Sequence, residues 1–240
     1  MMTTKRQILT ELVALSRALG EPCRAYVALG EGNTSAAIDR NTFWVKASGV
    51  PLQGIGPQGF IEVRHRDMDA AARRPQGAPP PGPRPSIEAL FHSWLLQVPG
   101  VRFVGHTHPT SVNRILCSRR SRALFRGRVF PDEIVYCGPE PVYVPYGDPG
   151  LPLARAIQRR VQAFRRRYGE PPRLVLLENH GIITLGRTPH EVLRITTMAV
   201  KTAEILWGAS LLGPPRYLTR AQAAHIARRP DEAYRRRLGT

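Results

Sequence analysis

Two histidines, His106 and His108, are separated by a single threonine in the stretch VGHTHP. Alternate residues of a β-strand project to the same side of the sheet, so imidazoles at positions i and i+2 can bind one metal ion together. The same pattern also occurs by accident on protein surfaces, and a metal site requires a further ligand from elsewhere in the chain. The pair therefore indicates part of a metal site that the rest of the sequence must complete.

Two other histidines are candidates for the third ligand. His180 follows the apolar run RLVLL and precedes Gly181, where a strand ends and the chain can turn sharply. Three neutral imidazoles leave one coordination position open, as in catalytic zinc sites. His92 stands four residues after Glu88 on a predicted helix, so the two side chains could pair with each other or compete as ligands. Spacing alone leaves the choice between His92 and His180 open. The remaining histidines are interpreted as structural: His65 and His190, with solvated neighbours, and His225.

A second group of polar residues could hold an anion. The loops in GEGNTSAAID and FWVKASGV contain Asn33, Lys46 and Ser48 among glycines, and exposed backbone N–H groups in such loops can bind phosphate. Ser86, at the predicted start of a helix, adds another group that favours anions. Two ordinary turns would give the same pattern. The glycines also lack the Walker or Rossmann spacing that would support an anion-binding site.

The elements that must position these residues alternate between helices and strands. Helices are predicted in TTKRQILTELVALSRALG, ending at Gly20; in SIEALFHSWLLQ, with Ser86 as N-cap; in LARAIQRRVQAFRRRYG; and in the long segment TPHEVLRITTMAVKTAEILWGAS. Thr188 is its predicted N-cap, and Glu191 completes a capping box. Strands are predicted in TFWVKASGV, VRFVGHTH, EPVYVPYG and RLVLLENHGIITLG. The proline-rich stretch 73–85 is predicted to be a surface loop. These elements indicate one layered α/β domain.

Composition restricts the class of protein. No apolar run approaches the roughly 20 residues that a membrane span needs, and the N-terminus reads as an amphipathic helix, so a cytoplasmic protein is expected. Three widely spaced cysteines fit neither a disulfide framework nor a zinc site. The formal net charge is +17, almost all from arginine. The basic runs are scattered and match no nucleic-acid-binding motif. A coding bias toward arginine, together with attraction for an anionic substrate, is therefore favoured over a nucleic-acid partner.

Five motifs occur in the order found in a known family. GNTS at 32, KASGV at 46, PSIEALFH at 85, GHTHP at 105 and ENHGIITLG at 178 resemble the successive signatures of the class II aldolase/adducin family. That family includes fuculose-phosphate and rhamnulose-phosphate aldolases and ribulose-5-phosphate 4-epimerase. Each motif is weak alone, but the ordered set is specific and extends over nearly the whole chain.

The resemblance implies a role for each candidate residue. His106, His108 and His180 match the zinc ligands, His92 becomes structural, and Glu88 matches a metal ligand that also serves as the acid/base. The positions that match the phosphate site are Asn33, Lys46, Ser48, Gly49 and Ser86. Many members have a second serine where this chain has Ile87, which removes one hydroxyl. In a loose alignment, Asp132 or Tyr136 matches an acid that reaches a neighbouring subunit.

The resemblance also implies a fold and an activity. We expect residues 1–240 to form a single three-layer α/β/α domain with a central, mainly antiparallel sheet, assembled as a C4 homotetramer. The implied reaction is retro-aldol cleavage of a ketose 1-phosphate, through an enediolate, to dihydroxyacetone phosphate and an aldehyde. Zn²⁺ is the implied cofactor, and imidazole ligands would also accept Mn²⁺, Co²⁺ or Fe²⁺. The alternatives are a sugar-phosphate epimerase, dehydratase or decarboxylase, and a non-catalytic adducin-like module.

Overall fold

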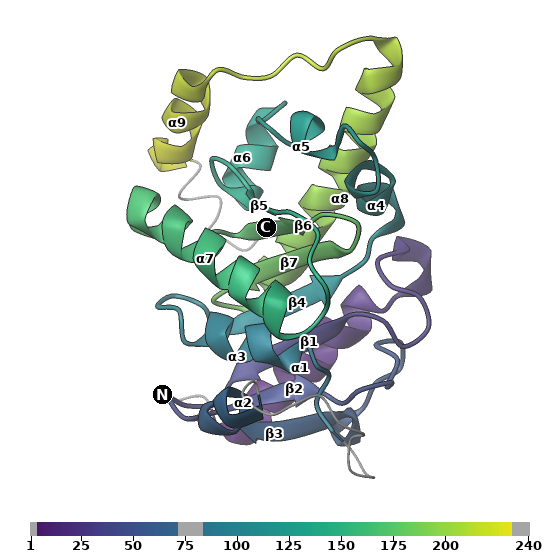
Figure 1. The fold of residues 1–240 in the computed structure, drawn as a ribbon, viewed down its shortest axis with the longest axis vertical. Helices are drawn as coiled ribbons and strands as arrows, with labels where there is room; N and C mark the ends of the chain where they lie inside the picture. Colours follow the sequence, from purple (N-terminus) through teal and green to yellow (C-terminus); the bar gives the residue numbers. More distant parts are fainter. Residues whose placement is uncertain (1–3, 72–83, 232–240) are drawn as a thin grey trace.

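The computed structural model describes residues 4–71 and 84–231, and a seven-stranded sheet runs through their centre (Figure 1). The strands are β1 (Asn33–Ala37), β2 (Thr42–Lys46), β3 (Phe60–Arg64), β4 (Phe103–Thr107), β5 (Val142–Val144), β6 (Leu174–Leu177) and β7 (Gly181–Gly186). They lie in the order β3-β2-β1-β4-β7-β6-β5. All neighbouring strands are antiparallel except β5 and β6, which are parallel. The prediction of a mainly antiparallel sheet is confirmed.

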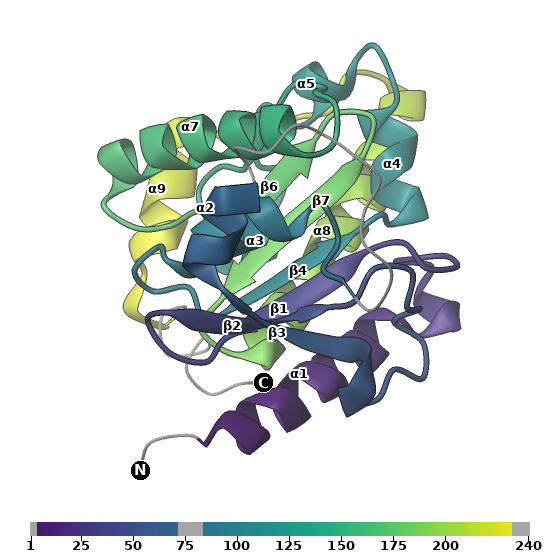
Figure 2. The ribbon, with the colours of Figure 1, turned by 60° about the horizontal axis from the view of Figure 1, so that its bottom comes forward.

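Helices cover both faces of this sheet (Figure 2). Their bounds are α1 (Lys5–Leu19), α2 (His65–Ala71), α3 (Ala89–Leu96), α4 (Thr110–Leu116), α5 (Ser121–Leu124), α6 (Pro131–Cys137), α7 (Leu151–Tyr168), α8 (Pro189–Leu212) and α9 (Arg220–Arg228). Helices α2, α3 and α7 lie on one face, whereas α1 and α8 lie on the other. One apolar cluster fills the space beneath α3 and α7, and two more lie beneath α1 and α8. This arrangement is the expected three-layer α/β/α fold.

The N-termini of α8 and α3 are set by local hydrogen bonds, and each differs in one respect from the prediction. Thr188 caps α8 as expected by accepting from the Glu191 N–H at 3.2 Å, but Glu191 Oε2 accepts from the Arg187 N–H, one residue before the cap. The predicted capping box is therefore displaced by one residue. Helix α3 begins at Ala89, because Ser86 Oγ accepts from the Glu88 N–H at 3.2 Å in a turn that precedes the helix. Ser86 is consequently not its N-cap.

Further expectations from the sequence concern membrane spans, the proline-rich stretch and the cysteines. None of the helices within residues 4–71 and 84–231 is long and apolar enough to cross a membrane. Most of the predicted proline-rich loop, at 73–83, lies outside the described residues. Its end is described, and there Pro85 forms an isolated β-bridge with Ala47. All three cysteines are unpaired, in agreement with their interpretation as thiols.

Candidate metal centre

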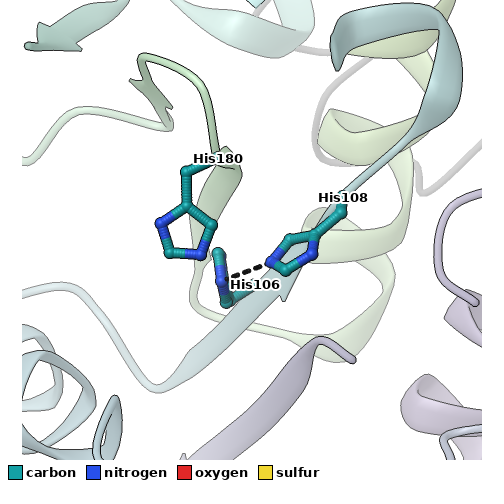
Figure 3. A group of neighbouring side chains, drawn as sticks. All are labelled: His106, His108 and His180. Carbon is teal, nitrogen blue, oxygen red and sulfur yellow. Dashed lines mark hydrogen bonds between the residues drawn. The ribbon is translucent and has the colours of Figure 1, made fainter. Parts of the chain in front are cut away.

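Strand β4 and the turn between β6 and β7 bring three histidines together (Figure 3). His106 lies on β4, where it pairs with Ile183 of β7, and His108 follows two residues later. His180 lies in the turn just before β7 and points toward the other two rings. A Cβ on Gly181 would lie 2.5 Å from the Thr107 carbonyl oxygen and 2.6 Å from His108 Cδ2, so only glycine permits this approach.

The three imidazoles converge on a common point. One nitrogen from each of His106, His108 and His180 lies within 4.8 Å of the others, a spacing at which a single ion could bind all three. His106 Nε2 and His108 Nε2 are 3.0 Å apart. The ring centroids are 4.7 to 4.9 Å apart, with the planes steeply inclined to one another. The structure therefore brings His180, and not His92, into this histidine cluster.

The outer ring nitrogens of two of these histidines are held by the protein. His106 Nδ1 lies 2.9 Å from the Ile182 carbonyl oxygen, and His108 Nδ1 lies 3.1 Å from Glu31 Oε2. Because a carbonyl and a carboxylate accept hydrogen bonds, each Nδ1 carries a proton, and in the neutral ring each Nε2 presents a lone pair. Two lone pairs that face each other at 3.0 Å repel unless a proton or a cation lies between them. The donor set therefore fits a divalent cation.

Glu88 completes the cluster from the opposite side. Its Oε1 lies 3.3 Å from His106 Nε2 and 3.1 Å from His180 Nε2, and its side chain is 11% exposed. Burial alone would raise the pKa of Glu88, but the adjacent His106 and His180 outweigh burial and hold that pKa below its usual range. Burial opposes the charged form of His106, yet Glu88 raises its pKa overall. Burial and the two neighbouring imidazoles lower the pKa of His108 to about 4.

The predicted anion-binding loops also meet near the histidine cluster. Ala47 bridges to Pro85, and the Ser48 N–H donates to the Arg84 carbonyl at 2.8 Å, so the segments containing Ser48 and Ser86 lie side by side. Ser48 and Gly49 are exposed, and Gly49 has a left-handed backbone with φ of 77°.

Lys46 lies beneath these loops. Its Nζ donates to the carbonyl oxygens of Val50 at 2.5 Å and Gly30 at 3.2 Å, so its ammonium group joins the two glycine-containing loops. Burial lowers the pKa of Lys46 to about 8, although Glu88 acts in the opposite direction. A role for Lys46 in phosphate binding stays a prediction.

Asn33 is buried beside Glu88. Its Nδ2 donates to Glu88 Oε2 at 2.6 Å, and its Oδ1 bonds to His92 Nε2. Both ends of the Asn33 amide therefore have partners within the protein, and its predicted contact with a phosphate is untested.

The remaining predicted residues lie elsewhere. Asp132 and Tyr136 are on α6, which packs against α8 and α9, and Tyr136 contacts an apolar cluster and Arg194. Their proposed reach into a neighbouring subunit stays a prediction. His65, interpreted as a structural residue with solvated neighbours, is buried between the exposed Arg64 and Arg66, bonds to Ser93 Oγ at 2.9 Å and stacks on Phe43.

Glu31 is a residue of the site that the sequence did not reveal. It lies in the GEGNTS motif, where only the glycines and the polar side chains of the phosphate loop were considered. An acidic residue in a glycine-rich loop was the available signal, but nothing local links it to His108, 77 residues away.

Comparison with known proteins shows the family of this chain and agrees with its fold. The family model for the class II aldolase and adducin N-terminal domain matches residues 10–207. The chain therefore belongs to the class II aldolase and adducin family.

Individual relatives are similar over much of this chain. The uncharacterized oxidoreductase YuxG of Bacillus subtilis is 29% identical over 215 residues, which is 81% of this chain but only 29% of YuxG. The chain thus spans less than a third of that relative's length.

Among solved structures, the aldolase/epimerase/decarboxylase candidate YgbL from Klebsiella pneumoniae aligns with a TM-score of 0.72 at 22% identity, covering 94% of this chain and 100% of YgbL. An L-fuculose 1-phosphate aldolase aligns with a TM-score of 0.73 at 18% identity, covering 94% and 96%. These two likenesses show the fold.

Proposed function

We propose that this protein is a metal-dependent class II aldolase that cleaves a ketose 1-phosphate to dihydroxyacetone phosphate and an aldehyde. The observation that carries the proposal is the convergence of His106, His108 and His180 within 4.8 Å, with Glu88 Oε1 in contact with two of them. Family membership and the fold shared with a fuculose-phosphate aldolase support it.

The three histidines would hold the metal through Nε2. Neutral imidazoles leave a divalent ion its full charge, and such an ion, when bound, stabilises the enediolate left by carbon–carbon cleavage beside a ketone. We propose Zn²⁺, because three histidines with one open position are typical of catalytic zinc. Mn²⁺, Co²⁺ and Fe²⁺ also bind imidazole, so the identity of the ion depends on measurement.

Glu88 is the proposed acid/base. Its carboxylate lies at the histidine cluster and is mostly shielded from water, which suits a group that moves a proton to and from the carbon beside the ketone. Asn33 holds Oε2 of this carboxylate, which leaves Oε1 directed toward the histidines.

The loops around the site would bind the phosphate. Ser48, Gly49 and Ser86 lie on adjoining segments, and Lys46 beneath them supplies a positive charge. The net charge of +17 would attract an anionic sugar phosphate. We further propose a cytoplasmic C4 homotetramer in which Asp132 or Tyr136 serves a neighbouring subunit.

The second candidate is an epimerase, dehydratase or decarboxylase that uses the same site. Ile87 favours a substrate that lacks the ketose phosphate, such as a β-keto acid, because a half-exposed apolar side chain stands where many relatives place a second phosphate-binding serine. Hydrogen exchange separates the two. An aldolase exchanges a C3 hydrogen of dihydroxyacetone phosphate with deuterium without any aldehyde present, whereas a site adapted only to a β-keto acid does not.

The direct experiment is a screen of ketose 1-phosphates against zinc-loaded protein, with release of dihydroxyacetone phosphate as the readout. The proposal predicts release from at least one ketose and loss of release in Glu88→Gln, which keeps its zinc. Full turnover by zinc-loaded Glu88→Gln would contradict the role of Glu88. Protein that binds no divalent metal would contradict the enzyme and favour a non-catalytic module.

A further inference from the structure

A chain of hydrogen bonds begins in the core and ends on Glu88. Ser35 Oγ lies 2.6 Å from Nδ1 of His92, which is fully buried on α3. His92 Nε2 bonds to Asn33 Oδ1, and Asn33 Nδ2 lies 2.6 Å from Glu88 Oε2. The other carboxylate oxygen, Oε1, faces His106 and His180.

The donors and acceptors in this series of hydrogen bonds can be assigned in one way only. The Glu88 carboxylate only accepts hydrogen bonds, so Asn33 must present its NH₂ group to Glu88 and its carbonyl to His92. His92 Nε2 must then carry the ring proton, and Nδ1 accepts from the Ser35 hydroxyl. Burial lowers the pKa of His92 to about 3, which keeps the ring neutral, while the two hydrogen-bond partners fix its tautomer.

We propose that His92 is a positioning residue that acts through Asn33 to fix the rotation of the Glu88 carboxylate. With Oε2 held by the Asn33 amide, Oε1 is directed toward the point shared by the histidines. Without His92, the Asn33 amide is free to rotate, and Glu88 loses its fixed orientation. The geometric part of the inference stands on these contacts alone, whereas its consequence for turnover rests on the proposed function.

His65 offers a matched control for a purely structural role. Both histidines are buried, both bond through Nδ1 to a serine hydroxyl, and both stack on a phenylalanine with centroids 4.8 Å apart. His65 follows Arg64, which pairs with Thr42 at the end of β2 opposite Lys46, so it lies at the other end of the sheet. Replacing either ring removes similar packing, but only His92 bonds to Asn33.

The test uses the full chain with His92→Leu, His92→Gln and His65→Leu. Crystal structures of the metal-free proteins give the first readout. We expect Glu88 Oε1 to remain within hydrogen-bonding distance of His106 and His180 in the wild type and in His65→Leu, and to turn away in His92→Leu. A Glu88 carboxylate that keeps its position in His92→Leu would overturn the inference. If His92→Leu does not fold, His92→Phe keeps a ring in the same packing but cannot donate to Asn33, and it is judged in the same way.

The second readout is the visible absorption of bound Co²⁺, which reports its coordination. His92→Leu is expected to bind Co²⁺ with a spectrum shifted toward that of Glu88→Gln. The third readout is turnover, where His92→Leu should lower kcat by about 10- to 100-fold with little change in KM. His92→Gln, which can still donate to Asn33, should recover much of this loss. His65→Leu should lower only Tm. Wild-type spectrum and kcat in folded His92→Leu would contradict the inference.

The outcomes separate the inference from the proposed function. A displaced Glu88 in His92→Leu, together with a wild type that cleaves no ketose phosphate, would retain the positioning role and reject the aldolase. An active wild type with an undisturbed Glu88 in His92→Leu would retain the aldolase and reject the positioning role of His92.

Discussion

The histidine cluster and the neighbouring glycine-containing loops use their polar groups in opposite ways. In the cluster, His106 and His108 each use Nδ1 for a hydrogen bond within the protein and direct Nε2 toward a shared point. At the loops, Lys46 Nζ from the end of β2 and the Ser48 N–H donate to backbone carbonyls, so these groups maintain the loops themselves. The cluster is thus preorganised to bind a metal ion. In the loops, by contrast, hydrogen bonds to backbone carbonyls must break before the same donors can bind a phosphate. Removal of side chains should therefore affect the cluster more than the loops.

The largest effect is expected from loss of a metal ligand. His180→Ala leaves two imidazoles, so the metal should be lost and activity should fall by more than about a thousandfold, since a catalytic ion supplies several kcal/mol. Metal content by mass spectrometry and turnover with added Zn²⁺ check this. His190→Ala, at an exposed histidine at the start of α8, is the control and should behave as wild type. A metal-replete, active His180→Ala would remove His180 from the site.

Glu88→Gln should have the next largest effect. It keeps the three histidines and the size of the side chain but removes the basic oxygen, so kcat should fall by about 10²- to 10⁴-fold with the metal retained. Steady-state kinetics at saturating metal measure this. A loss of activity that appears only below metal saturation would show that Glu88 acts only as a ligand.

A smaller effect is expected at Glu31, which holds the outer nitrogen of His108. Glu31→Ala should weaken metal affinity by about 10- to 100-fold while activity at saturating metal stays close to wild type. Competition with a chromophoric chelator measures the affinity. The matched control is Glu21→Ala, which removes a glutamate paired with Arg24 on the surface. Equal affinities in the two variants would show that the bond between Glu31 and His108 does not tune the site.

The smallest effect is expected in the loops and depends on pH. Burial lowers the pKa of Lys46 from 10.5 to about 8, so between these values the unfolded chain holds a proton that the folded protein has released. The free energy of unfolding of the wild type, relative to Lys46→Met, should therefore rise from about pH 8 to about pH 10, by at most about 1.4 kcal/mol per pH unit. Below pH 8, both states are protonated and the difference is constant. Guanidinium unfolding at several pH values checks this, and a difference that falls with pH would contradict it.

Much of the fold follows from sequence patterns that act locally. Apolar residues that recur about every 3.6 positions identify helices α1, α7 and α8, with caps such as Thr188. Short runs rich in apolar or β-branched residues identify strands β2, β4 and β6. Helix α6 was missed, because PDEIVYC is short and its apolar residues also suit a strand. The start of α3 was placed too early, since a serine before a helix was assumed to cap it, while Ser86 instead closes the preceding turn.

The three histidines of the site could be predicted from strand geometry and from the family resemblance, but their hydrogen-bond partners could not. His106 and His108 face the same side because they are two residues apart, and Gly181 explains why His180 can approach them. The bonds from Glu31 to His108 and from Asn33 to His92 join residues 77 and 59 positions apart. No local pattern encodes such pairs, because they depend on how β1 lies against β4 and α3.

The most direct test of the central claim is a crystal structure of zinc-soaked protein, measured on both sides of the zinc absorption edge. We expect one anomalous peak about 2.0 to 2.1 Å from Nε2 of each of His106, His108 and His180. A peak bound by fewer than three of these histidines, or no peak at zinc concentrations that saturate known zinc enzymes, would contradict it.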